Sequence, residues 1–121
     1  MNIVCVDDHP VMLKGLFQNV KQLLPDADVS IFESANAAYD FVKDHSCDVL
    51  ICEIELRGVD GITLANQVQG LYPEVNVIFH TVCDEKEHAR EVMRIRPSGY
   101  LVKPARAEQL AHELTHLRYN A

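Results

Sequence analysis

Several polar side chains in this chain stand at the ends of short apolar runs, where they could take part in chemistry. Asp7 and Asp8 follow the run 2–6, Glu53 follows 49–52, and Thr81 and Lys103 stand just beyond two later runs. Carboxylates that share one pocket repel each other, so a fold keeps them together only with a compensating positive charge. Lys103 or a hard cation such as Mg²⁺ could supply that charge. Polar residues that merely mark where strands reach water would seldom give five such side chains at matching strand ends. The pattern therefore predicts an acidic pocket whose charge is compensated by a cation.

Apolar runs alternate with helical patterns along the whole chain. We expect strands at 2–6, 27–32, 49–52, 75–79 and 99–102, and helices at 10–24, 34–45, 61–70, 84–95 and 107–118. Such alternation predicts an α/β fold, in which a parallel five-stranded sheet carries helices on both faces. The carboxyl ends of the strands meet at one edge of such a sheet, so the polar residues named above should converge there.

Length and composition narrow the classes of protein. The 121 residues indicate a single domain over 1–121, and the net charge of -7 argues against direct binding of nucleic acid. Neither a signal peptide nor an apolar run of the roughly 18 residues that a membrane span needs is present, so we expect a cytoplasmic location. The four cysteines, Cys5, Cys47, Cys52 and Cys83, lack C-x-x-C spacing and are predicted to be reduced, mostly buried thiols with no zinc or redox role.

The acidic pair at 7–8, the segment 48–61, Thr81 and the ending Ser98-Gly99-Tyr100-Leu101-Val102-Lys103-Pro104 together resemble the receiver domain of two-component response regulators. The resemblance covers nearly the whole chain. It implies a flavodoxin-like (βα)5 three-layer sandwich with strand order 2-1-3-4-5. The last segment is similar to receivers that precede DNA-binding output domains, which here would lie beyond the C-terminus.

The resemblance also implies a role for each site residue. The acidic pocket would be Asp7 and Asp8, the phosphoacceptor position Glu53, the switch residues Thr81 and Tyr100, and the conserved-type lysine Lys103. A bound Mg²⁺ would be held by Asp8, Glu53 and the backbone carbonyl of Glu55.

Three departures from the family pattern concern the phosphoacceptor. The family has Asp where this chain has Glu53, and a misplacement near 1 Å can cost on the order of 100-fold in rate. Val82 stands where the family usually has Ala or Gly and should crowd an approaching phosphate. Leu56-Arg57 replaces the usual Met-Pro, and Arg57 should either pair with Glu53 or Glu55 or lie in solvent.

The sequence therefore predicts an atypical receiver that signals by protein–protein interaction and is not an enzyme. Glu53 either imitates part of the phosphoryl charge, holding Thr81 and Lys103 in an active-like arrangement, or leaves an inert site. The alternative is a conventional, phosphorylated receiver that controls transcription through a separate DNA-binding domain. Expected partners are a histidine kinase or an output domain, and a homodimer could form through the face 84–118.

One competing motif points to a different function. His112, Glu113 and His116 form H-E-x-x-H, the helix motif of zinc-dependent hydrolases. At 100° per residue both histidines should face solvent, opposite the apolar stripe of their helix. Only five residues follow His116 and offer no third ligand, so the motif predicts at most adventitious binding of zinc or nickel.

Overall fold

Five parallel strands form one sheet in the order β2-β1-β3-β4-β5, as predicted. The computed structural model describes residues 1–120. Its elements in chain order are β1 (Asn2–Val6), α1 (Pro10–Leu23), β2 (Asp28–Phe32), α2 (Ala35–Asp44), β3 (Val49–Cys52), α3 (Gly61–Leu71), β4 (Asn76–Thr81), the 3-10 helix η1 (Glu85–His88), α4 (Ala89–Ile95), β5 (Gly99–Val102) and α5 (Ala107–Thr115). Within these described residues, no helix is long and apolar enough to cross a membrane.

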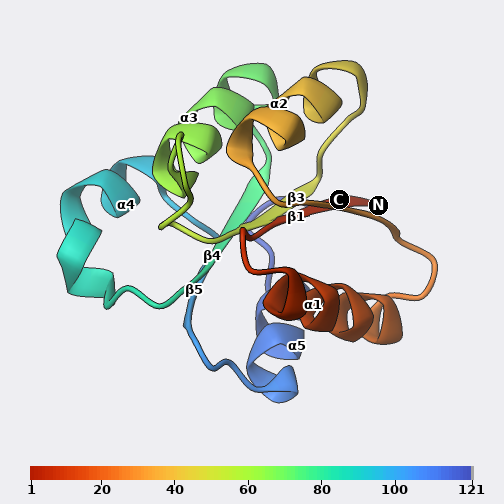
Figure 1. Cartoon of the computed structure of the whole chain (residues 1–121). Coiled ribbons are helices and arrows are strands. Elements are labelled where there is room, and N and C mark those ends of the chain that lie inside the picture. The colour runs from red at the N-terminus through yellow and green to blue at the C-terminus, as the bar shows by residue number, and fades with distance from the viewer. Residues whose placement is uncertain (121) are drawn as a thin grey trace.

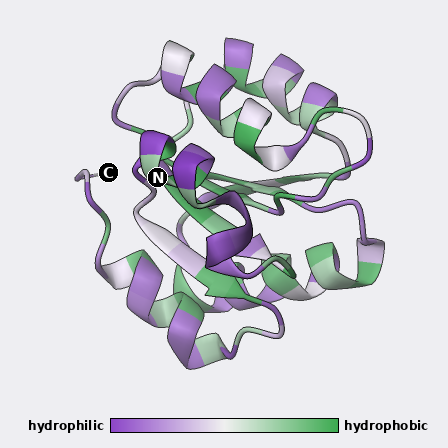
Figure 2. Cartoon of the chain, turned by 90° about the vertical axis from the view of Figure 1, so that its left-hand side faces the viewer, coloured by the Kyte–Doolittle hydropathy of each residue, from purple (hydrophilic) through white to green (hydrophobic). Residues whose placement is uncertain are grey.

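The sheet lies between two layers of helices (Figure 1). Helices α2, α3 and α4 cover one face, and α1 and α5 cover the other. Alternate residues of each strand supply the two cores: Leu50 and Val77 pack with the first set of helices, whereas Ile51 and Ile78 pack with the second. Figure 2 shows the hydrophobic strands between helices whose outer surfaces are hydrophilic.

The central strand β3 explains why the site can be buried. All four of its residues are fully buried, and it pairs with β1 on one side and β4 on the other. A strand covered on both faces and paired at both edges is a rigid element. It ends directly at Glu53, so the carboxylate of that residue is delivered from a fixed backbone.

Side-chain caps set the starts of two helices. Ser34 Oγ accepts a hydrogen bond from Ala37 N–H at 3.2 Å at the start of α2, and Asp60 Oδ1 accepts from Thr63 N–H at 2.8 Å at the start of α3. The cap on α3 also fixes the loop that connects Glu53 to this helix.

Three predicted elements differ from the structure by more than one residue. The helix expected over 84–95 begins as the 3-10 turn η1, because Asp84 and Glu87 form a capping box and His88 (φ -128°) interrupts the helix before α4. Helix α5 ends at Thr115 instead of at 118. At this end the Thr115 hydroxyl donates to the carbonyls of Ala111 and His112. Strand β4 continues to Thr81, so Thr81 belongs to the strand and is fully buried.

Candidate functional site

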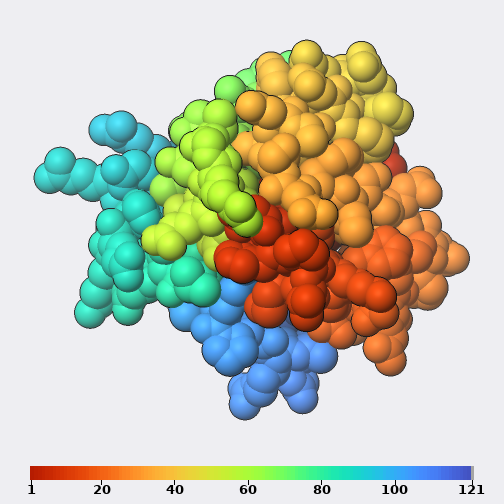
Figure 3. All heavy atoms as spheres, viewed as in Figure 1, coloured from red at the N-terminus to blue at the C-terminus, as the bar shows by residue number. Residues whose placement is uncertain are grey.

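The carboxyl ends of β1, β3, β4 and β5 meet at one edge of the sheet, as the sequence predicted. In Figure 3 the segment after β1 (red), the loop after β3 (yellow-green) and the segment after β5 (blue) abut on the same face. Asp7, Glu53, Thr81 and Lys103 come together at this point although up to 96 residues separate them. The predicted acidic pocket is therefore present in the fold.

A buried lysine lies between two buried carboxylates. Lys103 Nζ is 2.5 Å from Asp7 Oδ2 and 3.0 Å from Glu53 Oε1, and the three side chains are 5%, 2% and 0% exposed. Burial alone would raise the pKa of Asp7, but hydrogen bonds from Lys103 and His9 outweigh it and lower that pKa. Burial would lower the pKa of Lys103, but its bonds to the two carboxylates raise it. Asp7 and Lys103 are therefore both ionised at neutral pH.

Four donors surround the Glu53 carboxylate. Its Oε2 accepts hydrogen bonds from the backbone N–H groups of Ile54 at 2.7 Å and Glu55 at 3.3 Å. Its Oε1 accepts from Lys103 at 3.0 Å and from Val82 N–H at 3.4 Å. Both oxygens are therefore committed to protein donors, and none of the side chain reaches solvent.

The two predicted switch residues, Thr81 and Tyr100, both form hydrogen bonds with the backbone of Cys83. Thr81 Oγ1 accepts from Cys83 N–H at 3.1 Å, and the Tyr100 hydroxyl donates to the Cys83 carbonyl at 2.9 Å. Burial, reinforced by nearby acidic groups, raises the pKa of Tyr100 to about 12, so its hydroxyl stays a donor. Among the described residues, Glu53 reaches this segment through Val82 N–H and not through the Thr81 hydroxyl.

Asp8 carries the one buried side-chain oxygen without a hydrogen-bond partner in residues 1–120. Its Oδ2 accepts from Arg57 N–H at 3.1 Å and pairs with Arg57 Nε at 3.5 Å. Its Oδ1 is buried and unpaired, although His9 Nδ1 lies 3.2 Å away while bonding to Asp7. Arg57 pairs with neither Glu53 nor Glu55. Its side chain is 88% exposed, which agrees with the alternative that it lies in solvent, and the loop backbone brings its N–H to Asp8.

The predicted magnesium ligands are only partly available. The unpaired Asp8 Oδ1 is the kind of hard oxygen that Mg²⁺ binds, and Asp7, Asp8 and His9 offer ligand atoms within 4.8 Å of one another. Both oxygens of Glu53 are already engaged, whereas the Glu55 side chain lies 3.2 Å from Cys83 Sγ. Asp8 therefore fits Mg²⁺, whereas Glu53 could ligate only by giving up one of its donors.

The family model of the response regulator receiver domain matches residues 3–115, which include every residue of this pocket. The chain belongs to the receiver domain family. Receiver domains are signalling modules that commonly bind Mg²⁺ at the phosphorylation site and interact with kinases and output domains.

Relatives of this receiver domain include named regulatory proteins. The chain is 34% identical over 118 residues to the positive alginate biosynthesis regulatory protein of Pseudomonas aeruginosa, covering 94% of this chain and 46% of that protein. It is 31% identical over 112 residues to the oxygen regulatory protein NreC of Staphylococcus haemolyticus, covering 91% and 51%. This receiver domain thus spans about half the length of the curated relatives it matches.

A solved structure supports the fold assignment. A CheY-like receiver domain from Methanospirillum hungatei JF-1 superposes with a TM-score of 0.86 at 19% identity, covering 94% of this chain and 90% of that one. At this level of identity the likeness concerns the fold, and it agrees with the three-layer sandwich expected from the sequence.

The H-E-x-x-H residues of this receiver domain lie outside the pocket. His112 and His116 are exposed, as predicted, and their rings stack with centroids 4.0 Å apart. His116 is already beyond the end of α5. By contrast, His80 is buried and lines a cavity together with Leu16 of α1 and Leu110 of α5. Burial, followed by the nearby Lys103 charge, lowers the pKa of His80, so it is neutral.

Sequence reasoning missed the part that Cys83 plays in this receiver domain. It was predicted to be a buried thiol, and it is 2% exposed, but its N–H, carbonyl and sulfur all bond to site residues. The one available signal was its position two residues after Thr81, at the point where β4 enters the loop.

Proposed function

We propose that this receiver domain signals by protein–protein interaction without phosphorylation of residue 53. The observation that carries the proposal is the occupied carboxylate of Glu53, with four donors on two oxygens and no exposed surface. A nucleophile must present a free oxygen to the phosphodonor within tight geometric limits. Glu53 would first have to break bonds to Lys103 or to the loop backbone, and the longer side chain displaces its oxygens from the place an aspartate would hold them.

The same contacts support a partial imitation of the phosphorylated state. Glu53 neutralises Lys103 and holds the backbone of the loop after β4 through Val82 N–H. A phosphoryl group would bring up to about two charges and three acceptor oxygens, whereas this carboxylate brings one charge and two oxygens. Glu53 therefore imitates a phosphoryl group only in its contact with the loop backbone, because the Thr81 hydroxyl remains bonded to Cys83 N–H.

A phosphorylation assay tests the proposal. The domain is incubated with acetyl phosphate and Mg²⁺, and its intact mass is measured. We expect no gain of a phosphate in the wild type and a gain in Glu53→Asp, because the shorter side chain withdraws from Val82 N–H and leaves room for the phosphoryl group. Glu53→Gln is the matched control, since its amide cannot act as the nucleophile.

Two outcomes would overturn the proposal. Appreciable phosphate on the wild type, lost in Glu53→Gln, would show that Glu53 is a working acceptor. Phosphate that persists in Glu53→Gln would show that a neighbouring residue accepts it, and regulation by phosphorylation would then remain in place.

The second candidate is a conventional receiver that controls transcription through a DNA-binding domain outside this sequence. The buried, unpaired Asp8 Oδ1 favours it, because such an oxygen is suited to Mg²⁺. In that case Asp8, Glu53 and the Glu55 carbonyl would hold the ion, which would neutralise the charge on a transferring phosphoryl group. The partners would be a histidine kinase and an output domain that carries the DNA contacts, since this domain has a net charge of -7.

The face formed by residues 84–118 is proposed to make a homodimer. Met93 on α4 is 73% exposed and Val102 on β5 is 47% exposed, so this face offers apolar side chains to a second copy. We expect light scattering at high protein concentration to give the mass of a dimer, and Met93→Glu to shift it to that of a monomer. A wild-type mass that stays monomeric throughout the concentration series would contradict the dimer.

A further inference from the structure

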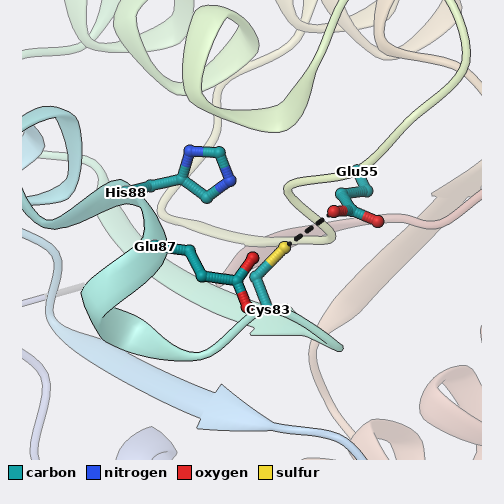
Figure 4. Close-up of side chains that lie close together, drawn as sticks. All are labelled: Glu55, Cys83, Glu87 and His88. Carbon is teal, nitrogen blue, oxygen red and sulfur yellow. Dashed lines mark hydrogen bonds between the residues drawn. The ribbon is translucent and has the colours of Figure 1, made fainter.

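Four side chains able to bind a metal gather beside the pocket but apart from its carboxylates. They are Glu55, Cys83, Glu87 and His88, and their ligand atoms all lie within 4.8 Å of one another. Figure 4 shows Glu55 reaching from the loop after β3 toward Cys83, with Glu87 and His88 coming from η1 on the other side. Two segments that are distant in the sequence thus point their donors at one place.

The local fold holds these residues in position and leaves atoms that could bind a metal available. Cys83 is buried, and its Sγ lies 3.2 Å from Glu55 Oε1. Glu87 uses only Oε1, which accepts from Asp84 N–H at 3.3 Å in the capping box, so its second oxygen is left over. The His88 ring makes no hydrogen bond among the described residues and is half-buried. The two glutamates are exposed, so an ion could enter from solvent.

The charges in this group favour a cation. No lysine or arginine in residues 1–120 pairs with Glu55 or Glu87 within 4.0 Å. Burial, with a further contribution from these carboxylates, raises the pKa of the Cys83 thiol to about 11. The thiol therefore keeps its proton until a cation replaces that proton, and metal binding would release it to solvent.

We infer that Glu55, Cys83, Glu87 and His88 form a site for a divalent transition metal of the zinc type. One sulfur, one imidazole nitrogen and two carboxylate oxygens suit a borderline-soft ion and discriminate against Mg²⁺ and Ca²⁺, which prefer all-oxygen sites. In a tetrahedral zinc site the ligand atoms are about 3.5 Å apart, so atoms that now lie up to 4.8 Å apart must approach by at most about 1.3 Å. Rotation of the exposed Glu55 and Glu87 side chains can provide that movement around the fixed sulfur.

A bound ion would connect the loop after β3 to the loop after β4. Cys83 also carries the hydrogen bonds of Thr81 and Tyr100, so the ion would restrain the segment on which both switch residues depend. The inference revises the sequence-based expectation for Cys83 alone. It stands on the geometry of the four donors and is independent of whether residue 53 accepts a phosphate.

Cobalt binding tests the site, because Co²⁺ reports a thiolate ligand through a sulfur-to-metal charge-transfer band. The experiment uses His112→Ala/His116→Ala as the background, which removes the exposed histidine pair, and saturating Mg²⁺ to occupy the acidic pocket. We expect one Co²⁺ per chain with the charge-transfer band, and displacement of Co²⁺ by Zn²⁺. Cys83→Ser should abolish the band, and the control Cys47→Ser, which removes a buried thiol elsewhere, should retain it.

His88→Ala provides a variant that leaves the core untouched. Loss of the His88 imidazole should lower the affinity for zinc by about 100-fold, measured in competition with a chromophoric chelator. A direct metal ligand should matter at least as much as a residue that only positions a ligand. Absence of the band in the background protein would refute the site. So would a band that survives Cys83→Ser, or an affinity that His88→Ala does not change.

Discussion

Lys103→Met is expected to lower the free energy of unfolding by about 3 kcal/mol at about pH 7, which is the scale for removing one partner from a buried ion pair. The side chains of Asp7 and Glu53 are 2% and 0% exposed, and Lys103 is the one cation within 4.0 Å of Glu53 in residues 1–120. Its removal leaves the buried Glu53 carboxylate without a cation and leaves Asp7 with only its hydrogen bonds from His9. Denaturation by urea measures the loss directly.

The pH dependence of stability around neutral pH should differ between the variant and the wild type. In the wild type, the lowered pKa of Asp7 gives stability that is present above its usual pKa and is lost as the pH falls through its folded value. The raised pKa of Lys103 gives stability that is present below its usual pKa and is lost as the pH rises through its folded value. The contribution of the pair is therefore constant around neutral pH. In Lys103→Met the unpaired carboxylates favour protonation in the folded state, so stability should rise as the pH is lowered from about 7 to about 5.

Two further variants make this expectation specific. Lys43→Met removes an exposed lysine that pairs with Asp40 at 3.2 Å, and it should cost no more than about 0.5 kcal/mol. Adding Glu53→Gln to Lys103→Met should restore part of the lost stability, because one of the two unpaired charges is gone. Equal losses in Lys103→Met and Lys43→Met would mean that the buried pair does not stabilise the fold.

The sequence predicted the fold because its signals were local and repeated. The apolar run 49–52 has no polar residue to mark an exposed face, which is typical of a central parallel strand, and β3 is indeed paired on both sides. The polar residues at the strand ends then had to converge, since parallel strands bring their carboxyl ends to one edge. Asp7, Glu53 and Lys103 meet for this reason.

The hydrogen bonds of the site could not be predicted in the same way. Backbone N–H groups of Ile54, Glu55 and Val82 surround the Glu53 carboxylate, and their directions depend on how two loops turn after their strands. The pairing of Arg57 with Asp8 likewise follows from the path of the loop backbone. Side-chain types and spacing carry no information about these directions.

The start of the fourth helix shows how local chemistry competed with periodicity. The sequence predicted a regular helix over 84–95. The Asp84 side chain instead accepts from Lys86 N–H at 2.8 Å and, with Glu87, closes a 3-10 turn. That turn brings Glu87 and His88 next to Cys83, so the proposed metal site depends on the same deviation from a regular helix.

Gly61→Ala is expected to lower the free energy of unfolding by about 3 kcal/mol, at the upper end of the usual cost of overpacking a core. Gly61 is the first residue of α3, and a Cβ atom there would lie 2.0 Å from the Glu53 carbonyl oxygen and 2.9 Å from Cys52 Sγ. Neither neighbour can move away easily, because the carbonyl is backbone at the end of β3 and the sulfur is fully buried.

The substitution should also disturb the site, which distinguishes it from a general loss of stability. The carbonyl that the new methyl group would displace belongs to the same peptide unit as Ile54 N–H, the shortest donor to the Glu53 carboxylate at 2.7 Å. Gly70→Ala is the matched control in the same helix: nothing lies within 4 Å of its added Cβ, and it should gain up to about 1 kcal/mol from helix propensity. If Gly61→Ala proved as stable as Gly70→Ala in urea, the close approach of α3 to the Glu53 backbone would not be a constraint on the fold. A clear difference between them would instead mean that Gly61 sets the distance between α3 and the strand that carries the carboxylate.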